Sequence, residues 1–348
     1  MMEHFDLIRS AASVEQILRI CRRRGRILIV VQNNPDPDAL ASAAILRELL
    51  SSHLKKRAVI GYAGTCGRAE NKAMNRVLRI GARRIELDDL EAFATICMVD
   101  TQPRFGNNSL GAVCHASVVI DHHITPHGAT PEADFCDVRP TYGATSTILY
   151  EYSLVSKLKL TPPLATALFY GIQSDTQDLG RETSPADMDA YLALFAAADK
   201  MKLAQIHRAP VPVDYFRVLQ DSLIGCVVAG TTVISAIREG FNPDMMAGVA
   251  DRMLRLAGVR ASVCYGVCGD TIHLSARTVD GRSNAARKMR RVVRRIGAGG
   301  GHNTVAGGQI PVNGDPEKRM AIVQARILKA FAANKPPKPL LTQKRTAK

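Results

Sequence analysis

The 348-residue sequence contains no tryptophan, and aromatic residues make up only 5% of it. Proteins that follow a single nucleic-acid strand usually stack successive bases on aromatic side chains. The composition therefore argues against an enzyme that processes long strands. The eight cysteines are scattered and never form a Cys-x-x-Cys pair, which argues against a zinc cluster of the finger type and is typical of a reduced compartment.

Long hydrophobic runs are also absent. The most apolar stretch, residues 223–230, runs into Thr231 and Thr232, well short of the roughly 20 residues that a membrane-spanning helix needs. The first 20 residues are interrupted by charged positions such as Glu3 and Asp6, a pattern unlike a secretory signal peptide. We therefore expect a cytoplasmic protein with no membrane partner.

Acidic residues are outnumbered by basic ones, since 32 Asp and Glu stand against 46 Lys and Arg, for a net charge of +14. The excess is not spread evenly along the chain. Residues 206–348 hold 23 Lys and Arg against 9 Asp and Glu, so the whole excess lies there. Such a basic half predicts a polyanionic partner, which the second half of the chain would hold.

Short apolar runs alternate with helical patterns over the first 200 residues. The runs at 27–31, 58–61, 96–99 and 118–120 predict buried strands of a mostly parallel sheet flanked by helices. After a proline-containing segment at 206–213, which we interpret as a linker, the pattern changes. Runs at 262–267 and 271–276 flank a Cys-Gly-Asp turn that predicts a hairpin. The predicted fold class is therefore α/β, with a smaller C-terminal α/β domain and a cleft between the two.

The length predicts two domains. We expect an N-terminal metal-binding catalytic domain, a linker, a substrate-binding C-terminal domain and a disordered basic tail. Their boundaries are 1–205, 206–213, 214–334 and 335–348, respectively.

Acidic and imidazole side chains follow the predicted strands and one predicted helix. They are Asp36 and Asp38, then Asp100, then His122 and His123, and finally Asp175. Because the carboxyl ends of parallel strands meet at one edge of a sheet, we expect these groups to converge. Crowded carboxylates repel one another unless a cation neutralises them, and oxygen-rich ligation with some imidazole favours Mn²⁺ or Mg²⁺ over Zn²⁺. Helix capping is the alternative for a single residue such as Asp38, but it does not account for all the segments together.

These segments resemble, in order, the four motifs of the DHH phosphoesterase superfamily: Asn-Pro-Asp-x-Asp at 34–38, Asp100, Asp-His-His at 121–123, and Asp175. Gly-Gly-Gly-His at 299–302 with Ala-Gly-Gly at 306–308 resembles the signature of the DHH-associated C-terminal domain. The resemblance covers about residues 25–312, and this C-terminal domain is of the type found with RecJ-like members. Among the subgroups, the compact two-domain length is most similar to nano-RNase and pAp phosphatases and to stand-alone cyclic-dinucleotide phosphodiesterases. It implies two Mn²⁺ ions, with Mg²⁺ as the alternative.

The resemblance also implies a role for each motif residue. Asp38, Asp100, His122 and Asp175 would hold one ion. Asp36 and Asp100 would hold the second ion, so that Asp100 bridges the two. His123 would face the scissile phosphate as an electrostatic stabiliser or proton donor, which makes His123 and Asp100 the expected catalytic residues.

Residue 32 departs from the family pattern, because Gln32 stands where the family usually has histidine. A neutral glutamine oxygen is a weaker ligand for Mn²⁺ than imidazole. Three interpretations remain open at this point. Gln32 ligates with a higher demand for metal, Asn33 or Asn34 substitutes for it, or the second ion is lost. We favour retained activity because every other motif residue is present.

The basic half carries the candidate substrate-binding residues. They are Arg277, Asn284, Gly300, Gly301 and His302, with Arg104 of the first domain added. We expect residues 297–302 to form a loop whose backbone N–H groups approach phosphate, followed by a helix that begins near Asn303. Arginines at 287, 290, 291 and 294 recur at helical spacing and share one face. The alternatives are a tight turn for the glycines and a solvated face for the arginines.

The function that combines these features is a manganese-dependent phosphodiesterase or phosphatase. Its substrate would be a short RNA or DNA or a small nucleotide phosphate, such as nano-RNA, pAp or a cyclic-dinucleotide product. The alternative is a non-catalytic nucleotide- or RNA-binding module in which Gln32 marks a degraded metal centre. A homodimer is compatible with the sequence, which leaves the oligomeric state open.

Overall fold

The structure is a computed structural model that describes residues 3–110, 113–125, 131–238, 243–280, 283–301 and 303–341. The chain divides into two compact units, Met1–Ala209 and Pro210–Lys348. The division falls inside the expected linker, 206–213, but helices occupy both ends of that segment: α7 (Lys200–His207) and α8 (Val213–Ile224). Each unit is described by itself.

The first unit is built on a parallel sheet, as the alternating apolar runs predict. Its strands are β1 (Ile27–Val30), β2 (Ala58–Tyr62), β3 (Arg83–Arg84), β4 (Thr95–Val99), β5 (Ala116–Asp121) and β6 (Ala133–Val138). Their order in the sheet is β3-β2-β1-β4-β5-β6, and every pairing is parallel. The strand order reverses between β1 and β4, which lie side by side, and β5 lies on the other side of β4.

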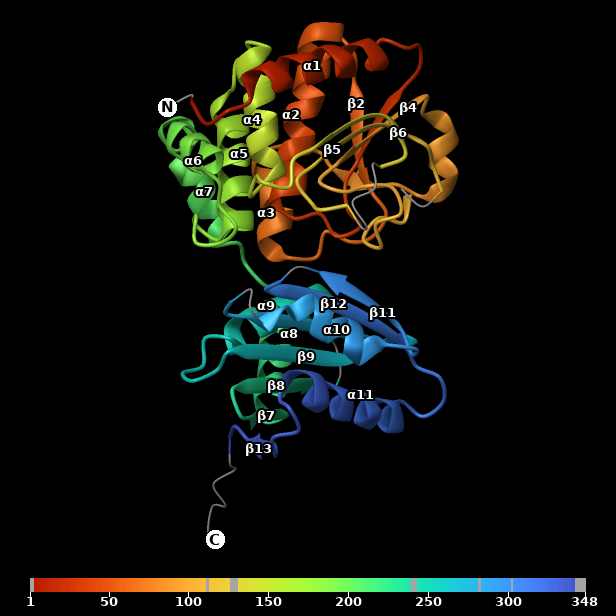
Figure 1. The fold of residues 1–348 in the computed structure, drawn as a ribbon, viewed down its shortest axis with the longest axis vertical. Coiled ribbons are helices and arrows are strands. Elements are labelled where there is room, and N and C mark those ends of the chain that lie inside the picture. Colours follow the sequence, from red (N-terminus) through yellow and green to blue (C-terminus); the bar gives the residue numbers. More distant parts are fainter. Residues whose placement is uncertain are drawn as a thin grey trace. The chain divides into compact units, whose positions relative to one another are not determined.

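Helices cover one face of this sheet (Figure 1). The unit contains α1 (Leu7–Cys21), α2 (Pro37–Leu54), α3 (Ala69–Val77), the 3₁₀ turn η1 (Leu87–Ala92), α4 (Thr145–Val155), α5 (Pro162–Thr176), α6 (Pro185–Ala197) and α7. Side chains alternate along β1, so Ile27 and Ile29 pack in the helical layer while Leu28 and Val30 join a smaller apolar cluster on the opposite face. A strand buried on both faces reads as a continuous apolar run, which is why β1 was predictable.

The second unit is a mixed sheet with helices on both faces. Its strands are β7 (Cys226–Ala229), β8 (Thr232–Ile237), β9 (Ala261–Cys268), β10 (Thr271–Thr278), β11 (Ala298–Gly301), β12 (Val305–Pro311) and β13 (Lys338–Pro339), in the order β11-β12-β10-β9-β8-β7-β13. The helices α10 (Ala285–Val293) and α11 (Pro316–Phe331) share one apolar cluster, and α8 and α9 (Pro243–Met253) share another. The hairpin expected at β9 and β10 is confirmed by their antiparallel pairing.

Three expectations for the second unit are wrong. The glycines at 299–301 do not form a loop but belong to β11, which pairs with β12. The segment from Asn303 does not begin a helix, because residues 305–311 form β12. The disorder expected for residues 335–348 does not hold at residues 338 and 339, which pair with β7.

Close packing explains Gly299 in β11 and Gly308 in β12. A Cβ atom added at Gly299 would lie 2.9 Å from the Gly307 carbonyl oxygen and 3.1 Å from Met289 Cγ on α10. At Gly308 an added Cβ would lie 2.9 Å from Met289 Sδ. These two glycines therefore allow α10 to lie directly on the sheet. In the sequence alone, a run of glycines that serves such packing looks the same as a glycine loop that binds a ligand.

Candidate metal centre

The predicted site residues follow three neighbouring strands at the carboxyl edge of the first sheet. Gln32 and Asp36 come after β1, Asp100 comes directly after β4, and His122 and His123 come directly after β5. This edge lies at the reversal of strand order, the position where α/β sheets bind ligands. The convergence expected from the sequence is present in the geometry.

Asp38 lies within the first turn of α2 and is completely buried. Its two carboxylate oxygens accept hydrogen bonds from the backbone amides of Thr145 and Ser146, each at 2.7 Å. These amides open α4, whose N-terminus favours a negative charge. Asp38 is thereby held in one orientation. The N-cap of α2 is not Asp38 but Asp36, whose Oδ1 accepts from Ala39 N at 3.0 Å.

Asp100 occupies the centre of the cluster. Its φ of +59° lies in the left-handed region, where a residue other than glycine is strained and aspartate is tolerated better than most. Asp100 Oδ1 accepts a hydrogen bond from Thr145 Oγ1 at 3.0 Å. The same oxygen lies 3.6 Å from both His122 Nε2 and His123 Nδ1. Asp100 is therefore a central, buried carboxylate close to both histidines, and its role as a bridge between two ions stays a prediction.

The two histidines have different partners. His122 Nδ1 lies 3.1 Å from the Tyr142 carbonyl oxygen, so this nitrogen carries the proton and Nε2 is turned toward the carboxylates. His122 Nε2 lies 3.3 Å from Asp175 Oδ2, yet this buried nitrogen makes no hydrogen bond of acceptable geometry with a described residue. His123 Nδ1 instead lies 2.7 Å from Asp121 Oδ1.

Burial, together with the crowding of acidic groups, raises several carboxyl pKa values in the cluster. Burial, reinforced by the charge of Asp175, raises the pKa of Asp36 to about 6 and that of Asp38 to about 7. Burial and the neighbouring carboxylate of Asp38 raise the pKa of Asp100 well above its usual value. Burial would lower the pKa of His122, but Asp175 and the other carboxylates raise it to about 10. The site therefore favours positive charge and disfavours further negative charge.

The residues present fit a divalent cation. Asp38, His122 and Asp175 each offer one ligand atom within 4.8 Å of the others, and so do Asp100, Asp121, His122 and His123. His122 Nε2 is the strongest single indication, because this buried atom lies among carboxylates without a hydrogen bond of good geometry to any of them, and a buried polar atom whose hydrogen bonding is incomplete is costly. Coordination of this nitrogen by a cation beside Asp175 would remove that cost.

Two supporting residues were missing from the sequence prediction. Asp121 was read only as part of the Asp-His-His motif, but it is buried and orients His123 through Nδ1. Burial would raise the pKa of Asp121, and the charge of His123 lowers it below its usual value. Gln102 donates from Nε2 to Asp121 Oδ2 at 2.8 Å and to the His123 carbonyl oxygen at 3.0 Å. Nothing in the spacing of Gln102 distinguishes it from an ordinary loop residue.

A buried ion-pair network supports the segment that holds His122. Arg139 donates to Asp137 Oδ2 at 2.7 Å and to Glu151 Oε2 at 2.8 Å, and all three side chains are almost inaccessible to solvent. Glu151 Oε1 also accepts from the hydroxyl of Tyr142 at 2.6 Å. The carbonyl of Tyr142 is the partner of His122 Nδ1, so the network fixes the backbone that orients this histidine.

The predicted substrate-binding residues have structural partners. Arg277 is 6% exposed and donates from Nε to Asp251 Oδ1 at 2.6 Å. Asn284 caps α10 by accepting from Arg287 N, and Arg104 pairs with the exposed Glu132 at 2.9 Å. Gly300 and Gly301 lie in β11, and His302 lies outside the described residues. Their roles in substrate binding stay predictions.

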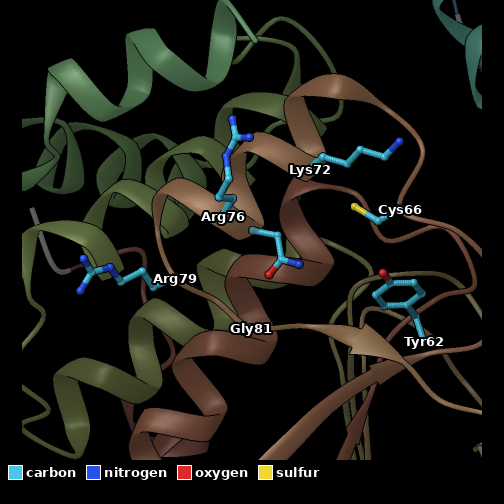
Figure 2. A pocket seen from close by; sticks show the side chains of 7 residues that line it. Tyr62, Cys66, Lys72, Arg76, Arg79 and Gly81 are labelled. Atoms are coloured by element: carbon cyan, nitrogen blue, oxygen red, sulfur yellow. The ribbon is translucent and has the colours of Figure 1, made fainter. Parts of the chain in front are cut away.

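A separate pocket of about 500 Å³ lies beside α3. Its lining includes the cationic residues Lys72, Arg76 and Arg79. Their charged ends point in three different directions rather than toward one point (Figure 2). The pocket also contains none of the predicted metal ligands, so we do not assign the chemistry of the site to it.

Comparisons with known proteins agree with the two-unit architecture. A model of the DHH family N-terminal domain matches residues 26–172, and a model of the DHHA1 domain matches residues 229–332. The uncharacterized protein MJ1633 of Methanocaldococcus jannaschii is 34% identical over 291 residues, which is 83% of this chain and 59% of that protein. The cyclic-di-AMP phosphodiesterase GdpP of Geobacillus thermodenitrificans is 28% identical over 329 residues, 89% of this chain and 48% of that protein.

Solved structures share the fold at low sequence identity. An exopolyphosphatase-related protein from Bacteroides fragilis superposes with a TM-score of 0.72 at 15% identity, covering 91% of this chain and 96% of that one. RecJ from Thermus thermophilus in complex with Mn²⁺ gives a TM-score of 0.58 at 18% identity, covering 97% of this chain and 56% of RecJ.

The two matched domains and the motif geometry define the class of the protein. The chain belongs to the DHH phosphoesterase superfamily and combines a DHH domain with a DHHA1 domain. It spans about half the length of the two sequence relatives named above. Within the described residues, no helix is both long and apolar enough to cross a membrane.

Proposed function

We propose that this chain is a metal-dependent phosphoesterase that hydrolyses short oligonucleotides or small nucleotide phosphates. The observation that carries the proposal is the buried cluster at the ends of β1, β4 and β5, where His122 Nε2 lies within 3.6 Å of Asp175 and Asp100 without a hydrogen bond of good geometry. A neutral hydrophobic core would not place these groups together, because uncompensated charges are costly to bury. Membership of a phosphoesterase superfamily supports the same chemistry.

Two cation positions are proposed, and Mn²⁺ is the favoured ion with Mg²⁺ as the alternative. Asp38, Asp100, His122 and Asp175 would hold the first ion, and Asp36 with Asp100 would hold the second. Oxygen ligands with one imidazole suit these hard cations. A bound divalent ion would supply charge neutralisation at the phosphate and activation of the attacking water.

The protein's own residues would orient the substrate and move a proton. We assign His123 as the electrostatic stabiliser or proton donor, because Asp121 accepts from its Nδ1 and fixes the ring. Because Nδ1 is held by Asp121, Nε2 is the ring atom that would face a phosphate or leaving-group oxygen. Gln102 holds both Asp121 and the backbone of His123, so the ring would already be oriented before the substrate binds.

The substrate class follows from charge and composition. The first 205 residues are neutral overall, whereas residues 206–348 carry the whole excess of +14. We propose that the second unit holds a polyanionic substrate and that Arg277, Asn284, Gly300, Gly301 and His302 contribute to it, with Arg104 contributing from the first unit. The low aromatic content favours a short substrate over a long strand. Nano-RNA, pAp and cyclic-dinucleotide products are the candidates.

Incubation of the purified protein with Mn²⁺ and a panel of these substrates tests the proposal. Hydrolysis of at least one is expected. The Asp100→Asn variant should lose turnover by at least about 100-fold, because the central carboxylate is the one group shared by both cation positions. Its fold is checked by thermal unfolding. Full activity of this variant would contradict the assignment.

The alternative function, a nucleotide-binding module without catalysis, gives a different result in the same assay. It is favoured by one observation, the presence of Gln32 beside Asp36 and Asp100. A binding module would show no turnover of any substrate, and its nucleotide affinity would survive removal of metal by a chelator. That combination would refute the proposed phosphoesterase.

A further inference from the structure

The side-chain amide of Gln32 lies between two carboxylates of the cluster. Its Nε2 atom donates to Asp36 Oδ2 at 2.6 Å and lies 3.4 Å from Asp100 Oδ2. The other oxygen of Asp36 already accepts from Ala39 N at 3.0 Å as the cap of α2. Both oxygens of Asp36 are therefore used, one by the backbone and one by Gln32.

Chemistry determines which end of the amide faces the carboxylates. An amide oxygen facing Asp36 and Asp100 would repel both carboxylates, whereas the NH₂ group has two hydrogens to donate. An amide NH₂ group is not a ligand for a hard cation. A metal ion at Asp36 would therefore have to displace the hydrogen bond from Gln32 and turn the amide so that its oxygen faces the ion.

The neighbouring asparagines do not replace the missing imidazole. Asn33 is bonded to Ser109 through both ends of its amide, at 2.9 Å each. Asn34 Oδ1 accepts from the backbone amide of Thr65 at 3.2 Å. Neither side chain is bonded to the carboxylate cluster. Of the three interpretations that the sequence leaves open, substitution by Asn33 or Asn34 has no support in the geometry.

The first cation position is built differently: both oxygens of Asp38 also accept hydrogen bonds, but from backbone amides at the start of α4, whereas one donor to Asp36 is the side-chain amide of Gln32. Asp38, His122 and Asp175 bring their ligand atoms within 4.8 Å of one another, and His122 Nε2 has no competing hydrogen bond with a described residue. Asp36 belongs to neither group of three or more candidate ligands. The first position thus needs no rearrangement of side-chain hydrogen bonds around His122, whereas the second requires the release of Gln32.

We propose that Gln32 makes the two cation positions unequal. One ion binds tightly at Asp38, Asp100, His122 and Asp175. The second ion binds at Asp36 and Asp100 only after it displaces the Gln32 amide, and so it binds weakly. The inference rests on the proposed metal-dependent function. It adds that the number of bound ions depends on the metal concentration: the chain holds one ion when metal is scarce and a second only when metal is abundant.

Counting bound Mn²⁺ without substrate tests this inference. Calorimetric titration of the metal-free full-length chain, checked by electron paramagnetic resonance of free Mn²⁺, should show one tight ion per chain and a second bound at least about tenfold more weakly. The Gln32→His variant should tighten the second ion by about tenfold or more, because imidazole supplies the nitrogen ligand that glutamine lacks. Gln32→Glu keeps the size of the side chain and should act in the same direction.

Asn33→His is the matched control, since it adds the same imidazole one residue away. It should leave the second affinity at the wild-type value. Two ions of equal affinity in the wild-type chain would overturn the inference while leaving the proposed function intact, as would unchanged second-site affinity in both Gln32 variants. Failure of the wild-type chain to bind any ion would instead refute the metal-dependent function itself.

Discussion

Thr145 connects the two halves of the metal cluster through one backbone amide and one hydroxyl. Its amide donates to Asp38 at 2.7 Å and its Oγ1 donates to Asp100 at 3.0 Å. Thr145 is completely buried, so no water can replace the hydroxyl without rearrangement. This residue therefore fixes the relative orientation of two carboxylates that come from different elements.

Removing this hydroxyl should weaken metal binding. Thr145→Val keeps the shape of the side chain but leaves Asp100 Oδ1 without its donor, so the affinity for the first Mn²⁺ should fall by about 10- to 100-fold. Thr145→Ser retains the hydroxyl and should stay close to wild type. Metal titration of both variants separates the two outcomes, and equal affinities would show that the hydroxyl does not position Asp100.

Asp137 is the most heavily bonded carboxylate behind the site. Burial would raise its pKa, but hydrogen bonds and charge from Arg139, with a hydrogen bond from Tyr152, lower it below the usual value. A carboxyl whose pKa is lower in the folded than in the unfolded state stabilises the fold above the unfolded pKa of about 4, and this contribution is lost as the pH falls through the folded value.

Asp137→Asn should therefore cost stability in a pH-dependent way. At pH 7 the loss of the buried charge opposite Arg139 should lower the free energy of unfolding by about 3 kcal/mol. The difference from wild type should begin to shrink below about pH 4, where the carboxyl becomes protonated in the unfolded chain, and should be lost only below the lower folded pKa. Urea unfolding of both proteins at pH 7 and pH 3.5 measures this, and a difference independent of pH would contradict the ion-pair account.

At the scale of elements, the sequence was sufficient to predict a strand wherever burial made that strand uniformly apolar. The runs that became β1, β4 and β5 were predictable for this reason, and with them the place of Asp100 and His122 at the sheet edge. The strand β6 was missed because its sequence, ADFCDV, contains two aspartates. One of these, Asp137, is buried because it pairs with Arg139 close by and with Ser13 and Arg9 far away in the sequence, and a linear pattern does not show the distant partners.

The glycines of β11 led to a different error: a loop was predicted where the structure has a strand, because a run of glycines occurs in both. Gly299 and Gly300 are adjacent, yet a Cβ at Gly299 would crowd α10 while one at Gly300 would meet nothing within 4 Å. Gly299→Ala should lower the free energy of unfolding by about 1–3 kcal/mol. Gly300→Ala should change it by no more than about 0.5 kcal/mol.

Urea unfolding of the two variants tests this account of β11. A Gly300→Ala chain that is as stable as wild type but binds nucleotide more weakly would, in addition, support the predicted contact of this backbone with phosphate. Equal destabilisation by both substitutions would show that packing against α10 is not the reason for glycine at 299.

At the scale of the whole molecule, the net positive charge is carried by residues 206–348, whereas the first 205 residues are neutral overall. The basic residues Arg287, Arg290, Arg291 and Arg294 are all exposed around α10, as the helical spacing predicted. None of them forms an ion pair with a carboxylate among the described residues. A solvated face and a binding face for a polyanion look alike in this respect, so a measurement must separate them.

Affinity for a short single-stranded RNA should depend on salt and on these arginines. Each phosphate contact adds about 0.7 to the slope of log affinity against log salt. The double variant Arg287→Gln, Arg291→Gln should therefore bind more weakly and lower that slope by about 1.4. The matched control, Arg22→Gln with Arg24→Gln, removes the same charge from exposed residues of the first unit. Equal slopes in both variants would mean that α10 does not contact the substrate.

The metal cluster gathers side chains from Asp38 to Asp175, which are far apart along the chain but meet at one edge of the sheet. Both groups of candidate ligands include His122, and one of them also needs Asp175 in the last turn of α5. Contacts of such long sequence separation form late in folding, after the local helices and neighbouring strands. During synthesis, a chain that has not yet extended past α5 lacks the group that contains Asp38, His122 and Asp175. Under the proposed function, capture of an ion at Asp38, His122 and Asp175 would therefore follow the assembly of this sheet rather than guide it, and it would report that α5 has docked on the sheet.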